Sequence, residues 1–159
     1  HDVRINDNFD LNNNYGVELF RNGDIENAKM HFEKSISQKE DWNVPHNNLG
    51  AILEKEGDIE GAKKEYKRSV ELGDYYLSFQ NLAAILVSTH DPNALDFIKT
   101  AFGKFPNSPS INRSAALAYY NAGDQTQALY FARRLLSLEP TEQNQILYNI
   151  IFNKQKLDF

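Results

Sequence analysis

Two segments of the chain decide its fold: NYGVELFRNGDIENAKMHFEKS at residues 14–35 and NLGAILEKEGDIEGAKKEYKRS at residues 48–69. The second segment repeats the first after 34 residues, with two glycines, an aspartate, an alanine, an aromatic residue and a serine at matching positions. Self-similarity at a fixed period of this size is the signature of a repeat protein, in which small units stack on their neighbours. The chain is therefore predicted to be an array of copies of one small unit.

Each copy is predicted to be a helical hairpin. Apolar or small residues recur at steps of three and four on both sides of a Gly-Asp pair, which is the period of a helix. Gly23 can adopt the left-handed conformation that ends the first helix, and the Asp24 carboxylate can accept from the free amides that open the second. Gly50 and Ala62 are small enough to let two helices approach closely, with Tyr66 filling the space beside them.

Two further units follow the first two. The alanines of the second helices align at spacings of 34, 32 and 34 residues, at positions 28, 62, 94 and 128. The third turn has His90 in place of glycine, and there we expect Asp91 to be the N-cap and Pro92 to lie in the first turn. In the fourth unit, Asp124 and Gln127 have the spacing of a capping box.

The chain is predicted to end in one more helix. Thr141 would cap this helix, which would run to about residue 154 with Ile146, Leu147, Ile150 and Ile151 on an apolar stripe. Its polar face would close the end of the array. The predicted organisation is a polar lead at 1–8, four units at about 9–42, 43–75, 76–107 and 108–140, and a capping helix and tail at 141–159.

This pattern of small and aromatic residues resembles the tetratricopeptide repeat. The resemblance implies an all-α fold, a right-handed α-solenoid of four helix-turn-helix repeats plus the C-terminal capping helix. The tryptophan that is usual in the first helix of each repeat is missing, and Asn12, His46, Phe79 and Asn112 stand near its place. This departure concerns the quality of packing more than the fold.

The resemblance also implies a place for binding, because the first helix of each hairpin lines a concave wall that usually receives a peptide. Carried over by position, the predicted groove residues are Asn13, Val17, Phe20, Arg21, Asn47, Ala51, Glu54, Lys55, Gln80, Ala84, Val87, Arg113, Leu117 and Tyr120, flanked by Ser88 and Asn121. The floor would be small and apolar, with amides on one margin to bond a peptide backbone. Three cations would favour an acidic residue in the ligand. Each groove residue could instead be plain solvated surface.

Two further residue patterns of the family bear on the predicted groove. Asn14, Asn48 and Asn81 recur in register, and in the family such residues usually brace neighbouring hairpins, which we prefer over ligand contact. The clamp with which some family members grip chaperone carboxylates needs three cations that this chain lacks at the matching positions. A two-carboxylate clamp is therefore not expected.

Composition narrows the classes of partner. The 159 residues carry a net charge of −5, from 22 acidic and 17 basic residues spread along the chain, so nucleic acid is a poor candidate partner. The longest apolar stretches fall far short of the roughly 20 residues that cross a bilayer, so no direct membrane insertion is expected. Cysteine is absent, which excludes disulfides and thiolate chemistry.

Nothing in the sequence predicts an enzyme. His1, His31, His46 and His90 show no metal-ligand spacing and no catalytic arrangement with a serine and a carboxylate. Each glycine is already explained by a hinge or a close contact, so no phosphate-binding loop remains. We expect no catalytic residue, no cofactor and no metal.

The predicted function is that of a scaffold or adaptor that holds a peptide or helical segment of another protein. The alternative is a structural or assembly protein that self-associates through the ends of the array. Between these two functions, the chain is expected to be a monomer or a weak homo-oligomer. Because the sequence opens on His1, the location stays open between the cytoplasm and an extracytoplasmic site after signal removal.

Overall fold

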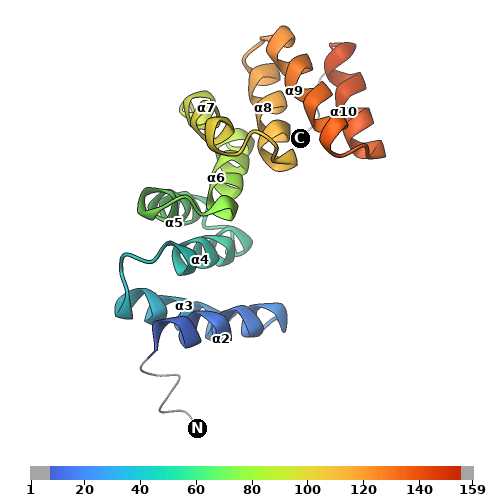
Figure 1. Cartoon of the computed structure of the whole chain (residues 1–159). Coiled ribbons are helices and arrows are strands. Elements are labelled where there is room, and N and C mark those ends of the chain that lie inside the picture. Colours follow the sequence, from blue (N-terminus) through green and yellow to red (C-terminus); the bar gives the residue numbers. More distant parts are fainter. Residues whose placement is uncertain (1–7, 155–159) are drawn as a thin grey trace. The chain divides into compact units, whose positions relative to one another are not determined.

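The computed structural model describes residues 8–154 and contains helices without strands in that range (Figure 1). The chain is thus all-α and of the helical-repeat solenoid class, as the sequence predicts. Residues 1–7 of the predicted lead and residues 155–159 of the predicted tail lie outside the described residues. The helices are α2 (Phe9–Arg21), α3 (Ile25–Gln38), α4 (Asn43–Glu56), α5 (Ile59–Leu72), α6 (Tyr76–Ser88), α7 (Ala94–Lys104), α8 (Pro109–Asn121), α9 (Gln125–Leu138) and α10 (Glu142–Phe152).

The chain divides into two compact units, residues 1–82 and 83–159, and α6 contributes residues to both. The first unit contains the hairpins α2–α3 and α4–α5. The second contains α7 and the neighbouring helices α8, α9 and α10, which lie side by side in Figure 1.

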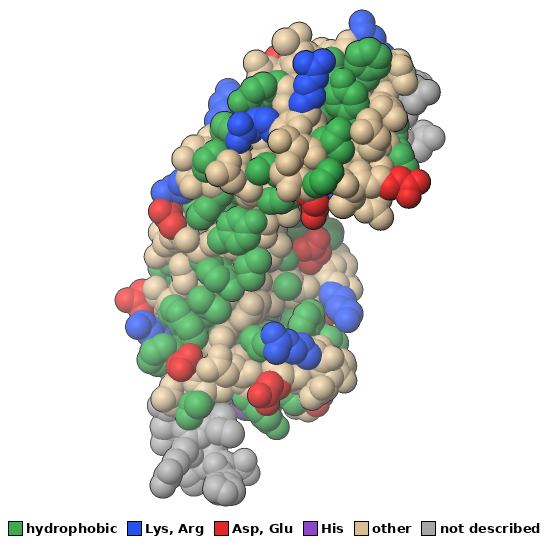
Figure 2. All heavy atoms as spheres, turned by 45° about the vertical axis from the view of Figure 1, so that its right-hand side comes forward, with side chains coloured by type: hydrophobic (Ala, Val, Ile, Leu, Met, Phe, Trp, Pro, Cys, Tyr) green, Lys and Arg blue, Asp and Glu red, His purple; other side chains and the backbone are tan. Residues whose placement is uncertain are grey.

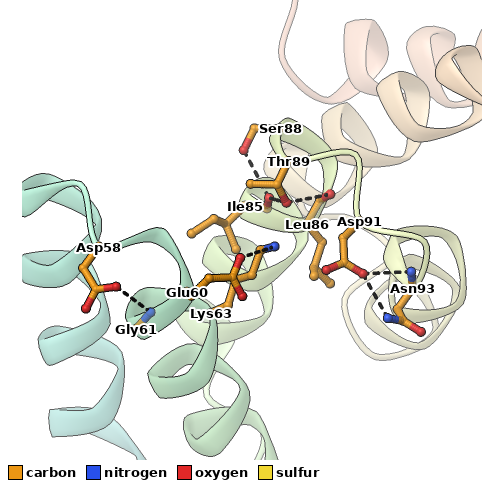
Figure 3. Close-up of polar contacts among 10 residues, drawn as sticks. All are labelled: Asp58, Glu60, Gly61, Lys63, Ile85, Leu86, Ser88, Thr89, Asp91 and Asn93. Atoms are coloured by element: carbon orange, nitrogen blue, oxygen red, sulfur yellow. Dashed lines mark hydrogen bonds and ion pairs between the residues drawn. The ribbon is translucent and has the colours of Figure 1, made fainter.

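The Gly-Asp pairs form the hairpin turns of the first unit as predicted. Gly23 and Gly57 have φ angles of 83° and 85°, in the left-handed region that glycine tolerates best. The Asp24 side chain accepts from the backbone of Asn27, and the Asp58 side chain accepts from Gly61 at 2.9 Å (Figure 3). These aspartates are helix N-caps, because they satisfy amides that the helix itself leaves free.

Close contact between the two helices of each hairpin explains the remaining glycines of the repeat. A Cβ atom placed on Gly16 would lie 2.7 Å from the ring of Phe32, and one on Gly50 would lie 2.7 Å from the ring of Tyr66. Both rings are fully buried, and Phe32 belongs to a core that includes Ala28, Leu49 and Ile52. The small residue of the repeat therefore leaves the space that the aromatic ring of the facing helix fills.

The repeated serine has a structural role that the sequence pattern alone did not explain. Ser35 is fully buried on α3, and its hydroxyl donates to the carbonyl of Phe9 at the start of α2 over 2.8 Å. Ser69 on α5 makes the same bond to Asn43 at the start of α4 over 2.7 Å. In both hairpins the second helix is thus fastened to the beginning of the first.

Polar residues occupy three of the four places where the family usually has tryptophan, and Phe79 occupies the other. Asn12 is fully buried, donates to Gln38 Oε1 and lies 2.9 Å from Nδ1 of His31, whose pKa burial lowers. In the second unit, buried Asn112 receives a hydrogen bond from the Arg134 Nε over 3.2 Å. Hydrogen bonds between the two helices of a hairpin therefore replace the packing of an indole ring.

The turn between α6 and α7 differs from the prediction. Helix α7 begins at Ala94 with Asn93 as its N-cap, so Asp91 is not the N-cap and Pro92 lies before the helix. The Asp91 carboxylate instead accepts from the backbone and side-chain amides of Asn93, both at 3.0 Å (Figure 3). This local turn competes with helix formation and delays the start of α7. His90 adopts the left-handed conformation, with a φ of 52°, that glycine adopts in the other hinges.

The last three helices follow the prediction in outline and correct it in detail. Thr141 is the N-cap of α10 as expected, and Ser108 is the N-cap of α8. Asp124 caps α9 by accepting from Gln127, but its own amide donates to the carbonyl of Tyr119, so the reciprocal half of a capping box is not formed. On α10 the predicted apolar stripe is only partly buried, because Leu147 and Ile151 are inside while Ile146 is 51% exposed.

Candidate functional site

The first-helix residues of the first unit fall into a buried set and an accessible set. Asn13 and Asn47 are only 4% and 3% exposed, and their Oδ1 atoms accept from the side chains of Asn48 and Asn81 at 2.9 and 3.0 Å. These bonds confirm the predicted bracing role of Asn48 and Asn81. The third residue of that register, Asn14, is exposed and donates to Asp10. The buried position of Asn13 and Asn47 argues against the direct contact with a peptide backbone that the sequence suggested.

The accessible set of the first unit is dominated by side chains that already contact one another. The ammonium of Lys55 lies 5.4 Å from the centre of the Phe20 ring, a cation–π contact between α4 and α2. Glu54 accepts a hydrogen bond from the buried hydroxyl of Tyr66 over 2.7 Å. Burial, together with this bond, raises the pKa of Tyr66 well above its usual range. Glu54 therefore supports the hairpin as well as facing solvent.

The other predicted groove residues of the first unit lie on α2, α4 and α6. Val17 and Ala51 are partly buried and Arg21 is exposed. On α6, Gln80 is partly buried, and its side-chain amide donates to the hydroxyl of Tyr76 over 2.6 Å. In this unit the prediction therefore concerns side chains along the faces of α2, α4 and α6.

In the second unit the structure brings four predicted residues together around one cavity. This α6/α8 pocket has a volume of about 160 Å³ and is lined by Ala84, Val87, Ser88, His90, Arg113, Ser114 and Leu117. Ala84 and Ser88 are exposed, whereas Val87 and Ser114 are buried in its wall. The resemblance to the tetratricopeptide repeat predicts Ala84, Val87, Arg113 and Leu117, with Ser88 beside them, as groove residues.

Two lining residues were missed by the sequence reasoning. The sequence interpretation treats His90 only as a substitute for the hinge glycine, whereas the structure places this residue in the lining of the pocket, with a φ of 52°. Ser114 follows Arg113 directly and is buried, at 5% exposure. The signal that could have found His90 was its place in a hinge where other repeats carry no side chain.

Arg113 is held in the pocket wall by the helix that follows its own hairpin. One terminal nitrogen of its guanidinium donates a short hydrogen bond to Oδ1 of Asn144 on α10. Asn144 is fully buried, and its side-chain nitrogen donates to the carbonyl of Glu139 over 2.7 Å and to the Glu139 carboxylate over 3.1 Å. The orientation of Arg113 is therefore fixed by a buried amide that is itself fully bonded.

Two other hollows lie in the second unit. One of about 230 Å³ sits at the α6–α7 hinge and shares Val87 and His90 with the α6/α8 pocket. The other, of about 350 Å³, is lined by Tyr120, Gly123, Gln125 and Lys154. The predicted residue Tyr120 thus belongs to a different hollow from Arg113 and Leu117, although all three lie on α8.

The surface carries charges of both signs. In Figure 2 the lysine and arginine side chains are scattered among carboxylates and neutral groups rather than gathered in one continuous area. Among residues 8–154 no cluster of three histidines or carboxylates could hold a metal ion. In the same range no helix is long and apolar enough to cross a bilayer.

Two segments of the chain match the sequence model of a known repeat family. The sequence model of the tetratricopeptide repeat matches residues 9–41 and 45–76, which contain the hairpins α2–α3 and α4–α5. These two segments of the chain are tetratricopeptide repeats. A comparison with curated protein sequences gives no match.

Solved tetratricopeptide repeat structures share the fold at low sequence identity. One is YrrB, described as a TPR protein with an unusual peptide-binding site, with a TM-score of 0.77, 16% identity and coverage of 91% of this chain and 76% of that one. Another is a MamA fragment from Desulfovibrio magneticus RS-1, with a TM-score of 0.81, 15% identity and coverage of 92% and 84%. A third is a thermophilic TPR protein from Thermus thermophilus, with a TM-score of 0.69, 18% identity and coverage of 92% and 82%. At these identities the likeness extends to the tetratricopeptide fold alone.

Proposed function

We propose that this tetratricopeptide protein is an adaptor that holds a peptide or helical segment of a partner protein against the first helices of its repeats. The tetratricopeptide repeats support the general function of a protein-protein interaction scaffold for this chain. The observation that carries the finer proposal is the α6/α8 pocket, an accessible hollow between two first helices with an apolar floor and one arginine. Pockets of this kind, mostly apolar with a few placed polar groups, are the usual sites of ligand anchoring.

The distribution of engaged and accessible groups supports the same proposal. The buried asparagines Asn13 and Asn47 are occupied in bracing the hairpins, so they keep the first helices in register. The neighbouring residues Arg21, Ala51 and Ala84 are partly or fully accessible and form no interhelical hydrogen bond among residues 8–154. Hydrogen bonds between buried side chains hold the first helices in register, while other side chains of the same helices stay accessible. This arrangement suits the binding of a peptide or helical segment of another protein.

An affinity capture from native cell extract tests the proposal. The wild-type chain is compared with Arg21→Glu/Arg113→Glu, with Ala84→Arg, and with the matched control Lys64→Glu/Lys67→Glu on exposed positions of α5. Captured proteins are identified by mass spectrometry. Because Arg113 bonds buried Asn144, thermal melting of each variant is measured alongside, and Ala84→Arg provides a variant that fills the pocket without touching that bond.

The proposal predicts a protein that is captured by the wild type and by the α5 control but lost with both first-helix variants. Equal capture by all four proteins would place the binding surface elsewhere. Loss with the α5 control alone would point to the second helices instead. None of these outcomes depends on knowing the partner in advance.

Self-association is the second candidate function. Leu11 and Tyr15 on α2 are 41% and 40% exposed, and Ile146 and Phe152 on α10 are 51% and 56% exposed. Exposed apolar side chains on the first and last described helices could pair two copies of the chain. Light scattering over a range of concentrations tests this, because a constant mass of 18.3 kDa would eliminate it.

A further inference from the structure

The shape of the α6/α8 pocket limits what can fill it. Its volume of about 160 Å³ is close to the roughly 150 Å³ of an engineered apolar cavity that binds benzene. Ala84, Val87 and Leu117 supply its apolar lining. One aliphatic side chain of leucine size therefore fits the pocket, whereas an extended stretch of chain does not.

The charged group that lines the pocket is a cation without an ion-pair partner among the described residues. Arg113 lines the cavity, and among residues 8–154 its guanidinium forms no ion pair with a carboxylate. Its hydrogen-bond partner, Oδ1 of Asn144, is a neutral amide oxygen, which orients the guanidinium without cancelling its charge. Since a guanidinium has five N–H groups in a planar fork, other donors remain for a ligand, and a carboxylate is the acceptor that fits this geometry best.

We propose that the α6/α8 pocket selects a partner segment in which an aliphatic side chain stands within a residue or two of a carboxylate, and that Asn144 is a positioning residue for this selection. The aliphatic group enters between Ala84 and Leu117, and the carboxylate accepts from Arg113. This inference rests on the proposed function, because it names the chemistry of the segment that the same site would bind.

The bonding of Asn144 explains why it can act as a positioning residue. Its side-chain nitrogen faces two oxygens of Glu139, so its Oδ1 must face Arg113. Its backbone amide donates to the Thr141 side chain at the start of α10, which fixes the residue in the first turn. A fully buried and fully bonded amide has one orientation, and the arginine that it holds loses little further freedom on binding a ligand.

Two pools of short synthetic peptides test the inference on the full chain. Both have neutral randomised flanks, and their centres are Leu-Glu in one pool and Leu-Gln in the other. Binding of each fluorescent pool is measured for the wild type, Arg113→Met, Asn144→Ala and Ala84→Arg. Lys99→Met, which removes an exposed lysine of α7, is the matched control for loss of a cation.

The inference predicts that the wild type and Lys99→Met prefer the Leu-Glu pool by about tenfold, the discrimination that one charge-assisted contact of about 1.4 kcal/mol provides. Arg113→Met removes the preference, Asn144→Ala reduces it several-fold, and Ala84→Arg weakens binding of both pools. The ratio between the pools separates positioning from folding, because a partly unfolded variant loses both pools equally.

The failures of the two proposals are distinguishable. If the wild type binds both pools equally well, the charge selection is overturned while peptide binding stands. If Asn144→Ala keeps the full preference, the positioning role is overturned. If neither pool binds the wild type, the selection is overturned at this pocket, and the affinity capture decides whether the first helices bind a partner elsewhere.

Discussion

Nδ1 of His46 lies 2.7 Å from the carboxylate of Glu65, across the hairpin formed by α4 and α5. The His46 side chain is 9% exposed, and its second nitrogen, Nε2, is buried without a hydrogen-bond partner among the described residues. This residue stands near the place of the usual family tryptophan, so a polar pair replaces an apolar ring. Such a pair is most sensitive to the loss of one partner, because the other is then left buried and unsatisfied.

A double-mutant cycle on this pair should show strong coupling. Glu65→Leu leaves both nitrogens of His46 without a partner and is expected to lower the free energy of unfolding by about 1–3 kcal/mol. The double variant His46→Phe/Glu65→Leu should recover much of that loss, because both polar groups are gone. Chemical denaturation measures the four proteins. Glu71→Leu, at an exposed position of α5, should change stability by less than about 0.5 kcal/mol. Additive single effects would show that the pair is uncoupled.

A second prediction concerns the close approach of the helices in the second hairpin. Gly50→Ala places a methyl group 2.7 Å from the Tyr66 ring, and overpacking of this kind should cost about 1–3 kcal/mol. Gly103→Ala on α7 meets nothing within 4 Å and should stabilise the chain by about 0.5–1 kcal/mol through helix propensity. Thermal melting compares the two. If both substitutions have the same sign, close packing at Gly50 is not the reason for its glycine.

The hydrogen bond from Tyr66 to Glu54 should make stability depend on pH in the alkaline range. Burial and this bond raise the pKa of Tyr66 above the ordinary value of 10.0. A raised folded-state pKa gives stability that is complete below the unfolded pKa and is lost above it. The wild type should therefore lose up to about 1.4 kcal/mol per pH unit above pH 10 relative to Tyr66→Phe.

Urea unfolding at a series of pH values from neutral to alkaline measures this difference. At neutral pH, Tyr66→Phe should be less stable than the wild type by about 0.5–1.5 kcal/mol, the usual value of a hydrogen bond. Because lysines and other tyrosines titrate equally in both proteins, only the difference between them is informative. A constant difference across the series would contradict the predicted shift.

The left-handed hinge residue His90 gives a fourth prediction. Its φ of 52° is a conformation that costs an ordinary residue energy and a glycine almost none. His90→Gly, which restores the residue found in the other hinges, should stabilise the second unit by up to about 1 kcal/mol. His90→Val should destabilise it, since a β-branched residue fits this conformation poorly. Differential scanning calorimetry would measure both changes, and equal effects would dismiss the conformational explanation.

The fold was predictable because the repeat encodes it redundantly. Gly23 with Asp24 and Gly57 with Asp58 form the same turn, and the aligned alanines set the register of all the second helices. The start of α7 was not predictable from these rules, because the bonds between Asp91 and Asn93 form a local turn that competes with capping. Helical periodicity cannot weigh two such local options against each other.

The candidate site was predictable only in part. The family resemblance assigns Ala84, Val87, Arg113 and Leu117 to the binding side of their helices, and the structure places these four around one pocket. Such an assignment rests on the side of a helix that each residue occupies. It does not tell how deeply the next hairpin covers that side, which is why Asn13 and Asn47 proved to be buried braces. The bond from Arg113 to Asn144 depends on the distance between two helices, and no sequence spacing reports that distance.

Site-directed photo-crosslinking in native cell extract tests whether a partner protein binds to the first helices of the repeats. A photoreactive amino acid is placed at Lys55 or Ser88, on first helices, or at Lys64 or Lys99, on second helices, all at exposed positions. Binding at the first helices predicts that Lys55 and Ser88 give a shared adduct with a partner protein and that Lys64 and Lys99 do not. Adducts formed only from Lys64 and Lys99 would contradict it and place binding on the second helices.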